Sequence, residues 1–296
     1  MTSTAPSITP LMRAYEHVLL DLDGCLWVGG EATRNAPQAL EALRAAGKRL
    51  AFITNDSRSS AEEYVRKLWS LGFRASLEEV VTVGGALQHY LAEQHGARRS
   101  SAYVIGPPAI FRHVADAGLR VVNHTPSAPH AEVVVVAWHE GFGYGELRIA
   151  TQALLGGADF VVAGRDRTFP MPDGMWPATG SIVAALEYAS GREALSVGKP
   201  EQGIFFTALD RLGPGRALVV GDRLDADLAG AHAAGLDGAI VLSGATSRAE
   251  ADAAEDPRPV AIAVDLAALV LGDAPPSLSP TPPAPPPPPE WNRAAG

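Results

Sequence analysis

The sequence predicts an α/β protein with a mostly parallel sheet. Short apolar or β-branched runs alternate with segments whose apolar residues recur at helical spacing, which is the pattern of right-handed βαβ units. The chain has 296 residues, more than a single domain usually holds, so two packed units or one unit with a large insertion are expected. A hydrophobic content of 47% with 19% charged residues is typical of a globular fold.

The expected elements follow one another along the chain. The strands share a short, mostly apolar run, and they are His17–Leu22, Arg49–Thr54, Ala102–Ile105, Glu132–Ala137, Phe160–Ala163, Ala217–Val220 and Gly238–Leu242. The helices are marked by apolar residues on one helical face, as in Ala39, Leu40 and Leu43; Tyr64, Val65, Leu68 and Trp69; Ile182, Val183 and Leu186; and Phe205, Phe206 and Leu209. No repeat of fixed period and no heptad run interrupts this alternation.

The two ends of the chain differ in composition from the segment between them. The first residues are rich in Ser, Thr and Pro, so 1–13 is expected to be a flexible N-terminus, with order beginning near Tyr15. Proline dominates 273–296, which predicts an extended, disordered tail because proline cannot supply ladder hydrogen bonds. A proline-rich tail can bind an aromatic-lined groove of a partner protein, but the sequence identifies no partner.

Charge and cysteine content argue against several classes of protein. A net charge of -9 provides no basic surface for a phosphate backbone, so a nucleic acid polymer is not an expected partner. The single cysteine, Cys25, cannot form an internal disulfide, and no signal-peptide pattern opens the chain, which favours the cytoplasm. The longest apolar runs are of strand length, so no membrane span is expected.

Two acids, Asp21 and Asp23, directly follow the apolar strand residues Val18 to Leu20. Ligands of open α/β sheets bind at the carboxyl ends of the strands. Side chains two positions apart on an extended chain point to the same side, so two carboxyls, or one carboxyl and a backbone carbonyl, can converge on one cation. Gly24 then permits a sharp turn.

Two other interpretations compete for this acid pair. Asp-Gly after a strand is also ordinary turn chemistry, and the pattern alone does not decide between a turn and a site. A calcium-binding EF-hand loop is the second alternative. It fails because Leu26 stands where that loop requires Gly, and Ala32 where it requires Glu.

Three further polar motifs also follow expected strands. Thr54 and Asn55 offer a hydroxyl and a backbone amide suited to phosphate oxygens. Lys199 precedes a proline that can open a helix, which places a point charge beside a helix N-terminus. Asp222 and Asp227 belong to an acidic segment in which a second metal-facing carboxylate is expected. Thr-Asn and Lys-Pro are commonplace alone, and the ordered recurrence of all the motifs favours a catalytic site.

In this order and spacing, the motifs resemble those of the haloacid dehalogenase (HAD) superfamily of phosphohydrolases. The long segment between the Thr54 and Lys199 motifs is similar to the C2-type α/β cap of subclass IIA, the nitrophenylphosphatase-like branch. The resemblance implies a Rossmann-like parallel-sheet core with an inserted α/β cap domain. The implied division is a core formed by 14–83 and 193–272, with a cap formed by 84–192.

The resemblance also implies how the acids act. Asp21 would be the nucleophile that carries the phosphoryl group as an aspartyl phosphate. Asp23 would protonate the leaving alkoxide and then take a proton from the attacking water. Mg²⁺ is the implied cofactor, with the Asp21 carboxylate, the Asp23 carbonyl and Asp222 as its ligands.

Phosphate binding is implied for the remaining motif residues. Thr54, the Asn55 amide and Lys199 would bind the non-bridging phosphate oxygens. Asp227 would orient metal-bound water or Lys199 without touching the phosphate. Asp225 is interpreted as a helix-start acid, with a place beside the metal as its alternative.

The chain departs from the family pattern next to the acid pair and in the cap. Cys25 stands where Thr is usual; a redox switch is one interpretation, and a small packed side chain is favoured because flanking carboxylates discourage the thiolate. Two cap loops lack the familiar residues, which makes Trp138, His139, Arg165 and Asp166 the candidates for substrate specificity. For His139 a structural role is favoured over substrate contact, because a lone histidine in a cap is more often structural.

The predicted function is hydrolysis of a small phosphomonoester, glycerol phosphate-like or an aryl phosphate, by a Mg²⁺-dependent enzyme. A nucleoside monophosphate or pyridoxal phosphate is the next alternative, with Trp138 as a surface for ring stacking. A phosphotransferase or mutase would use the same Asp21 chemistry, and a non-catalytic binding protein would be expected to lack one of the motifs. The physiological substrate and a homo-oligomeric state are left open.

Overall fold

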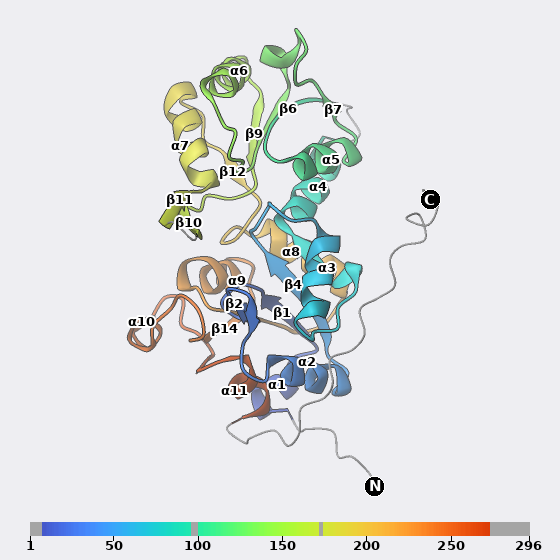
Figure 1. The fold of residues 1–296 in the computed structure, drawn as a ribbon, viewed down its shortest axis with the longest axis vertical. Coiled ribbons are helices and arrows are strands. Elements are labelled where there is room, and N and C mark those ends of the chain that lie inside the picture. Colours follow the sequence, from blue (N-terminus) through green and yellow to red (C-terminus); the bar gives the residue numbers. More distant parts are fainter. Residues whose placement is uncertain (1–7, 96–99, 172–173, 273–296) are drawn as a thin grey trace, which may run out of the picture.

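The computed structural model describes residues 8–95, 100–171 and 174–272. They form two parallel sheets that lie one above the other along the long axis of the molecule, each covered by helices (Figure 1). The predicted disordered tail at 273–296 lies outside the described residues. No helix in the described part of the chain is both long and apolar enough to span a membrane.

The lower sheet in Figure 1, the core sheet, has six parallel strands in the order β15, β14, β13, β1, β4, β5. Their bounds are β1 His17–Asp21, β4 Arg49–Thr54, β5 Val80–Thr82, β13 Ala217–Gly221, β14 Asp237–Val241 and β15 Ala261–Ala263. In the interior of the sheet, Leu20 of β1 pairs with Phe52 of β4 and Val220 of β13. Because the strands are parallel, the segments that follow β1, β4 and β13 meet at one edge.

Alternate residues of the core strands pack against different helices. Val18 and Leu20 join a cluster with α1 Pro10–Arg13, α2 Ala36–Ala45, α3 Ala61–Ser70 and α11 Leu266–Leu271. Leu19 and Ile53 join a second cluster with α4 Val83–Gln94, α8 Gly203–Leu212 and α9 Ala229–Ala233. The central strands are thus buried on both faces, which explains their nearly continuous apolar sequence.

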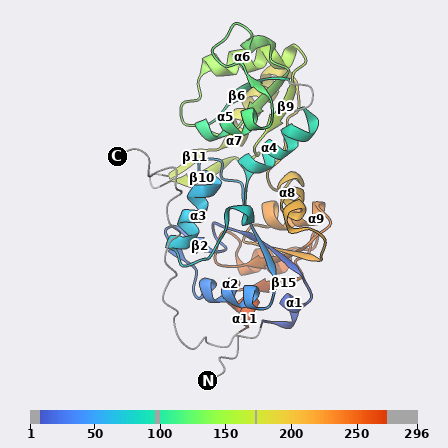
Figure 2. The ribbon, with the colours of Figure 1, turned by 90° about the vertical axis from the view of Figure 1, so that its right-hand side faces the viewer.

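The upper sheet, the cap sheet, has five parallel strands in the order β12, β9, β8, β6, β7. Their bounds are β6 Ser101–Ile105, β7 Arg120–Val121, β8 Val133–Val136, β9 Asp159–Val162 and β12 Leu195–Ser196, and the helices packed on them are α5 Pro108–Asp116, α6 Tyr144–Leu155 and α7 Thr179–Ser190. Helix α4 contacts both α5 and α8, and one apolar cluster runs through it from sheet to sheet. Figure 2 shows α4 at this junction.

Two short hairpins lie outside the main sheets. β10 Thr168–Met171 and β11 Gly174–Pro177 pair antiparallel near the junction of the two sheets in both ribbon views (Figures 1 and 2). β2 Trp27–Val28 and β3 Glu31–Ala32 form the other hairpin, directly after the acid pair. The remaining short elements are η1 Leu77–Glu79, η3 Ala128–His130, η4 Leu224–Leu228 and α10 Arg248–Ala253.

The expectation that 1–13 is flexible is wrong for its described part. Ile8 and Met12 are buried in the core cluster, and Met12 lies in α1. The Thr9 hydroxyl donates a hydrogen bond to the Leu269 carbonyl oxygen at 2.8 Å. The Ser, Thr and Pro content of this segment did not indicate that its two apolar residues, Ile8 and Met12, are buried in the core cluster. Their burial orders the segment.

The cap sheet also extends further along the chain than expected. The segment assigned to the core begins at 193, but Leu195 and Ser196 pair with Val161 and Val162 of β9. The chain therefore returns to the core only after Ser196. The α/β class and the Rossmann-like parallel core are confirmed, and the division into a core and a cap domain stays a prediction.

Candidate active site

The candidate site lies where the carboxyl ends of the two sheets face each other. β12 of the cap sheet leads directly into Lys199, whose ammonium reaches Asp21 at the end of β1. Asn55 follows β4 of the core sheet, and its side chain meets Asp166, which follows β9 of the cap sheet. Each sheet thus presents its ligand-binding edge to the other.

Three buried carboxylates gather at the edge of the core sheet. Oxygens of Asp21, Asp222 and Asp227 lie within 4.8 Å of one another. Lys199 lies among them, and its Nζ donates to Asp21 and, at 2.7 Å, to Oδ1 of Asp227. The structure thus brings together four of the residues that the sequence analysis selected from distant motifs.

Burial governs the electrostatics of this cluster. Burial raises the pKa of Asp21 to about 8, against the lowering effect of Lys199, and burial also raises the pKa of Asp222. Burial alone would lower the pKa of Lys199, but Asp21 and Asp227 outweigh it and raise that pKa. Lys199 therefore stays an ammonium among three carboxyl groups, while burial favours the neutral form of Asp21.

The cluster fits a magnesium ion in charge and in ligand type. When all three carboxyls are ionised, the Lys199 ammonium balances one negative charge, and a divalent ion carries the charge that balances the other two. Carboxylate oxygens are the ligands that Mg²⁺ prefers. Asp227 has both oxygens engaged, one by Lys199 and the other by the Arg223 backbone N–H at 3.1 Å, which suits the supporting role predicted for it.

Two glycines provide the space that Asp222 occupies. A β-carbon added at Gly24 would lie 2.3 Å from Oδ2 of Asp222, and one added at Gly244 would lie 2.0 Å from the same oxygen. The Ala245 backbone N–H donates to that oxygen at 2.6 Å, which fixes the carboxylate. Gly24 entered the sequence analysis only as a turn residue, and Gly244 carried no signal at all.

Asp23 lies outside the carboxylate cluster. Its carboxylate accepts a hydrogen bond from Nε1 of Trp27 at 2.7 Å, and Nζ of Lys67 lies 4.0 Å away. The Asp23 side chain is 59% exposed, whereas that of Asp21 is 10% exposed. The acid and base role of Asp23 stays a prediction.

The residues at the end of β4 support the site through their side chains. Thr54 is buried, and its hydroxyl accepts the Asp56 backbone N–H at 3.1 Å. The Asn55 side chain binds both backbone groups of Lys199: Oδ1 accepts from its N–H at 2.8 Å, and Nδ2 donates to its carbonyl at 2.9 Å. The sequence analysis gave Asn55 only a backbone role and missed this brace.

Two of the four cap candidates are engaged within the cap. Nη2 of Arg165 donates to Glu187 at 2.8 Å and to the Ala194 carbonyl at 2.7 Å, so it braces α7, and its role in specificity stays a prediction. Nε2 of His139 lies 3.2 Å from Oε1 of Glu146. Trp138 is half-buried in the same loop after β8.

Asp166, the fourth cap candidate, reaches across to the core. Its Oδ2 accepts from Nδ2 of Asn55 at 3.2 Å, and its Oδ1 accepts from Nη1 of Arg223 at 3.2 Å. Both oxygens of Asp166 are thus engaged by core side chains, a placement that the sequence analysis did not anticipate. Arg223 carried no assignment in the sequence analysis, although it directly follows Asp222.

This chain is similar in sequence to known hydrolases. The family model of the haloacid dehalogenase-like hydrolases matches residues 18–120, and a second HAD-hydrolase-like model matches 196–269. The D-glycerol 3-phosphate phosphatase of Mycobacterium tuberculosis is 40% identical over 261 residues, which are 86% of this chain and 72% of that protein. This chain belongs to the haloacid dehalogenase-like hydrolases.

Solved structures of phosphatases share the fold of most of this chain. The glycerol phosphate phosphatase of Mycobacterium tuberculosis in complex with magnesium aligns with a TM-score of 0.79 at 36% identity, covering 89% of this chain and 78% of that one. The p-nitrophenyl phosphatase from Archaeoglobus fulgidus aligns with a TM-score of 0.78 at 27% identity, covering 85% of this chain and 97% of that one. The predicted subclass, the phosphatase class and the magnesium cofactor are confirmed.

Cys25 of this HAD hydrolase is buried beneath the acid pair. Its Sγ lies 3.8 Å from the Val220 carbonyl oxygen. Burial, followed by the charge of Asp21, raises the pKa of the thiol well above its usual value. These surroundings favour the packed side chain over the redox switch.

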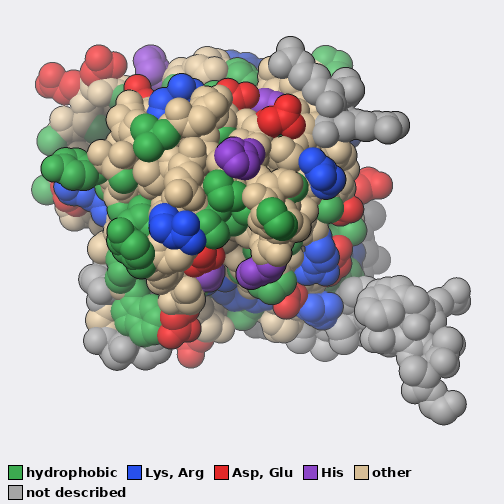
Figure 3. Space-filling view, turned by 90° about the horizontal axis from the view of Figure 1, so that it is seen from above, with side chains coloured by type: hydrophobic (Ala, Val, Ile, Leu, Met, Phe, Trp, Pro, Cys, Tyr) green, Lys and Arg blue, Asp and Glu red, His purple; other side chains and the backbone are tan. Residues whose placement is uncertain are grey.

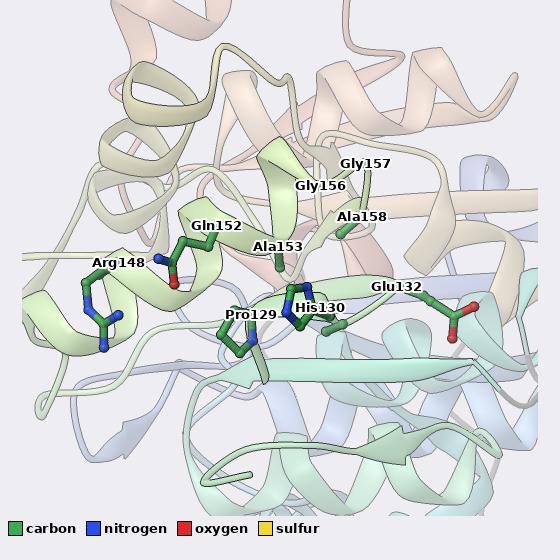
Figure 4. Close-up of a pocket in the computed structure, with 10 residues that line it drawn as sticks. Pro129, His130, Glu132, Arg148, Gln152, Ala153, Gly156, Gly157 and Ala158 are labelled. Atoms are coloured by element: carbon green, nitrogen blue, oxygen red, sulfur yellow. The ribbon is translucent and has the colours of Figure 1, made fainter. Parts of the chain in front are cut away.

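A second hollow lies on the cap, away from the acid cluster. It has a volume of about 860 Å³, and its lining includes Glu132, Arg148 and Gln152 (Figure 4). Its residues precede β8 and β9, so it lies at the amino edge of the cap sheet, opposite the edge that faces the core.

Among the described residues on the face seen in Figure 3, Lys and Arg side chains are scattered among acidic and apolar ones. The absence of a nucleic acid partner stays a prediction.

Proposed function

We propose that this HAD hydrolase transfers the phosphoryl group of glycerol phosphate to Asp21 and then to water. The observation that carries the proposal is the buried contact between Asp21 and Lys199, beside Asp222 and at the carboxyl end of β1. The ammonium orients the carboxylate and lies within reach of the oxygens of a phosphorus atom that bonds to Asp21.

Asp21 is the proposed nucleophile. As its oxygen bonds to phosphorus in line, the bond from phosphorus to the alkoxide oxygen breaks, and Lys199 holds the non-bridging oxygens. Bound Mg²⁺, with Asp21, Asp222 and the Asp23 carbonyl as its proposed ligands, supplies charge neutralisation of the phosphate. Asp227 holds the Lys199 ammonium in place.

Asp23 is the proposed acid and base. It gives its proton to the departing alkoxide and later takes one from the water that hydrolyses the aspartyl phosphate. The Thr54 hydroxyl and the Asn55 backbone N–H complete the proposed phosphate site. Their place at the carboxyl end of β4 supports this role, because β4 pairs with β1 and Ile53 is the register partner of Asp21.

Glycerol phosphate is the proposed substrate because a relative named for it matches 86% of this chain. Trp138 and His139 are the proposed contacts of the leaving group, since they follow β8 at the cap edge that faces the core. A cytoplasmic location belongs to the same proposal. The single, buried Cys25 supports it, because disulfides mark oxidising compartments.

A phosphate-release screen tests the proposal. The purified chain is assayed with glycerol phosphate, p-nitrophenyl phosphate, pyridoxal phosphate and nucleoside monophosphates, with Mg²⁺ and with a chelator, and Asp21→Asn serves as the inactive control. Turnover is expected to be highest with glycerol phosphate and to require Mg²⁺. A higher kcat/KM for a nucleotide or pyridoxal phosphate would replace the substrate, and phosphate release undiminished in Asp21→Asn would reject the nucleophile.

A further inference from the structure

The cap contacts the phosphate-binding loop of the core through one carboxylate. Asp166 uses one oxygen for Nδ2 of Asn55 and the other for Nη1 of Arg223, each at 3.2 Å. The carboxylate of Asp166 is 25% exposed, and its ion-pair partner Arg223 is 41% exposed. A pair so placed is screened less than a pair on the open surface.

The contact continues from Asn55 to Lys199. Nδ2 of Asn55 has two hydrogens, and these serve Asp166 and the Lys199 carbonyl, while Oδ1 accepts from the Lys199 N–H. Every polar atom of this amide is therefore engaged, and its orientation is fixed from both sides. The backbone that it grips carries the ammonium that binds Asp21.

The backbone around Gly198 is tightly packed against the cap loop that begins at Ala163. A β-carbon at Gly198 would lie 2.3 Å from the Ala163 carbonyl oxygen and 2.8 Å from Oδ1 of Asn55. The cap loop before Asp166 is thus in direct backbone contact with the loop of Lys199. A displacement of one loop is transmitted to the other, because close-packed groups cannot absorb it.

We propose that Asp166 is a positioning residue, which sets the place of Lys199 through Asn55 and thereby couples the seating of the cap to phosphate binding. The inference rests on the proposed function and adds a residue that acts without touching the leaving group. Arg223 is the second arm of the same device: it holds Asp166 while its own backbone N–H holds Asp227, the other partner of Lys199.

Steady-state kinetics of Asp166→Ala separate this role from substrate contact. Misplacement of Lys199 is expected to lower kcat about tenfold, by the same factor for glycerol phosphate and p-nitrophenyl phosphate. Inhibition by orthovanadate, which has no leaving group, is expected to weaken by a similar factor. A loss confined to one substrate, with vanadate inhibition unchanged, would show that Asp166 contacts the leaving group and overturn the inference.

Conservative variants test the two arms separately. Asp166→Asn keeps an acceptor for Asn55 but loses the charge facing Arg223, so it is expected to retain most of the wild-type kcat. Arg223→Met is expected to lower kcat slightly, and Arg223→Met combined with Asp166→Ala to do no more harm than Asp166→Ala alone, since both act on one device. Fully additive losses in the double variant would overturn the shared role.

The matched control is Asp210→Ala, which removes a contact of 3.3 Å with His89 between α8 and α4, away from the site. It is expected to leave kcat and vanadate inhibition unchanged, with folding of all variants followed by thermal unfolding. If the wild-type enzyme is active and Asp166→Ala has the same kinetics, this inference is rejected and the proposed function stands. A wild-type enzyme that neither releases phosphate nor is bound by vanadate rejects the proposed function.

Discussion

The edge of the core sheet and the loops of the cap satisfy their charged groups in different ways. At the core edge, Asp21, Asp222 and Asp227 are buried around a single ammonium, and their charge is left for a metal to balance. In the cap, Arg165 pairs with Glu187 and His139 lies beside Glu146, each with one partner on the neighbouring helix.

The difference separates charged groups that serve catalysis from charged groups that stabilise the fold. A buried cluster with excess charge lowers stability, so its persistence at one sheet edge indicates a function. Charged groups with single partners at half-exposed positions need no functional explanation. Asp166 belongs to neither group, because it lies in the cap and its partners lie in the core.

The largest expected effect is that of Asp21→Asn. The amide cannot attack phosphorus, so kcat should fall by at least about 10³-fold. The fold should be retained, because the substitution removes a buried charge and keeps the shape of the side chain. Single-turnover assays of phosphate release and thermal unfolding check both parts. If Asp21→Asn kept a turnover within tenfold of the wild type, the buried cluster at the core edge would not be the catalytic site, and the distinction drawn between core and cap would fail.

Lys199→Met is expected to have the second-largest effect on kcat, and it should also lower stability. Loss of the charge that binds phosphate should lower kcat by about 10²-fold to 10³-fold. Removal of the ammonium that binds buried Asp21 and Asp227 should lower the free energy of unfolding by about 3 kcal/mol when Mg²⁺ is chelated. Denaturant titrations with and without Mg²⁺ measure the second effect, and Mg²⁺ should reduce it. Equal stability of variant and wild type in chelator would contradict the electrostatic account.

Gly244→Ala should impair metal binding with a smaller loss of maximal rate. The new methyl group would meet Oδ2 of Asp222 and displace that carboxylate, so the half-saturating concentration of Mg²⁺ should rise roughly tenfold. Gly30→Ala is the matched control, because a β-carbon there meets nothing within 4 Å. Magnesium titrations of activity give the answer, and identical curves for the two variants would exclude the proposed role of Asp222.

The smallest effect is expected from Arg165→Ala. The variant loses a half-exposed ion pair and a hydrogen bond to the Ala194 carbonyl, which should lower the free energy of unfolding by about 1 kcal/mol. Its kcat/KM should stay within about threefold of the wild type. A tenfold rise in KM for glycerol phosphate would restore Arg165 as a specificity residue and weaken the distinction between the two regions.

Much of the core could be predicted because its signals are local. The run from Val18 to Leu20 predicts a buried strand, and the acids that follow it must lie at the sheet edge. Thr54, Lys199 and Asp222 were found in the same way, each after an apolar strand. The contacts of the cap loops could not be predicted in this way. Arg165 and Asp166 are neighbours in sequence, but Arg165 binds Glu187 within the cap and Asp166 binds Arg223 in the core.

The sequence by itself determined the α/β alternation, the order of the motifs and the acids that stand at strand ends, because each depends on residues close together in the chain. Only the tertiary structure decided that Lys199 bridges Asp21 and Asp227, and that Asp166 turns to the core. The physical reason is that parallel strands joined by helical crossovers bring together residues far apart in the chain. Which side chains then meet is settled by packing and by the pairing of buried charges, to which no local pattern corresponds.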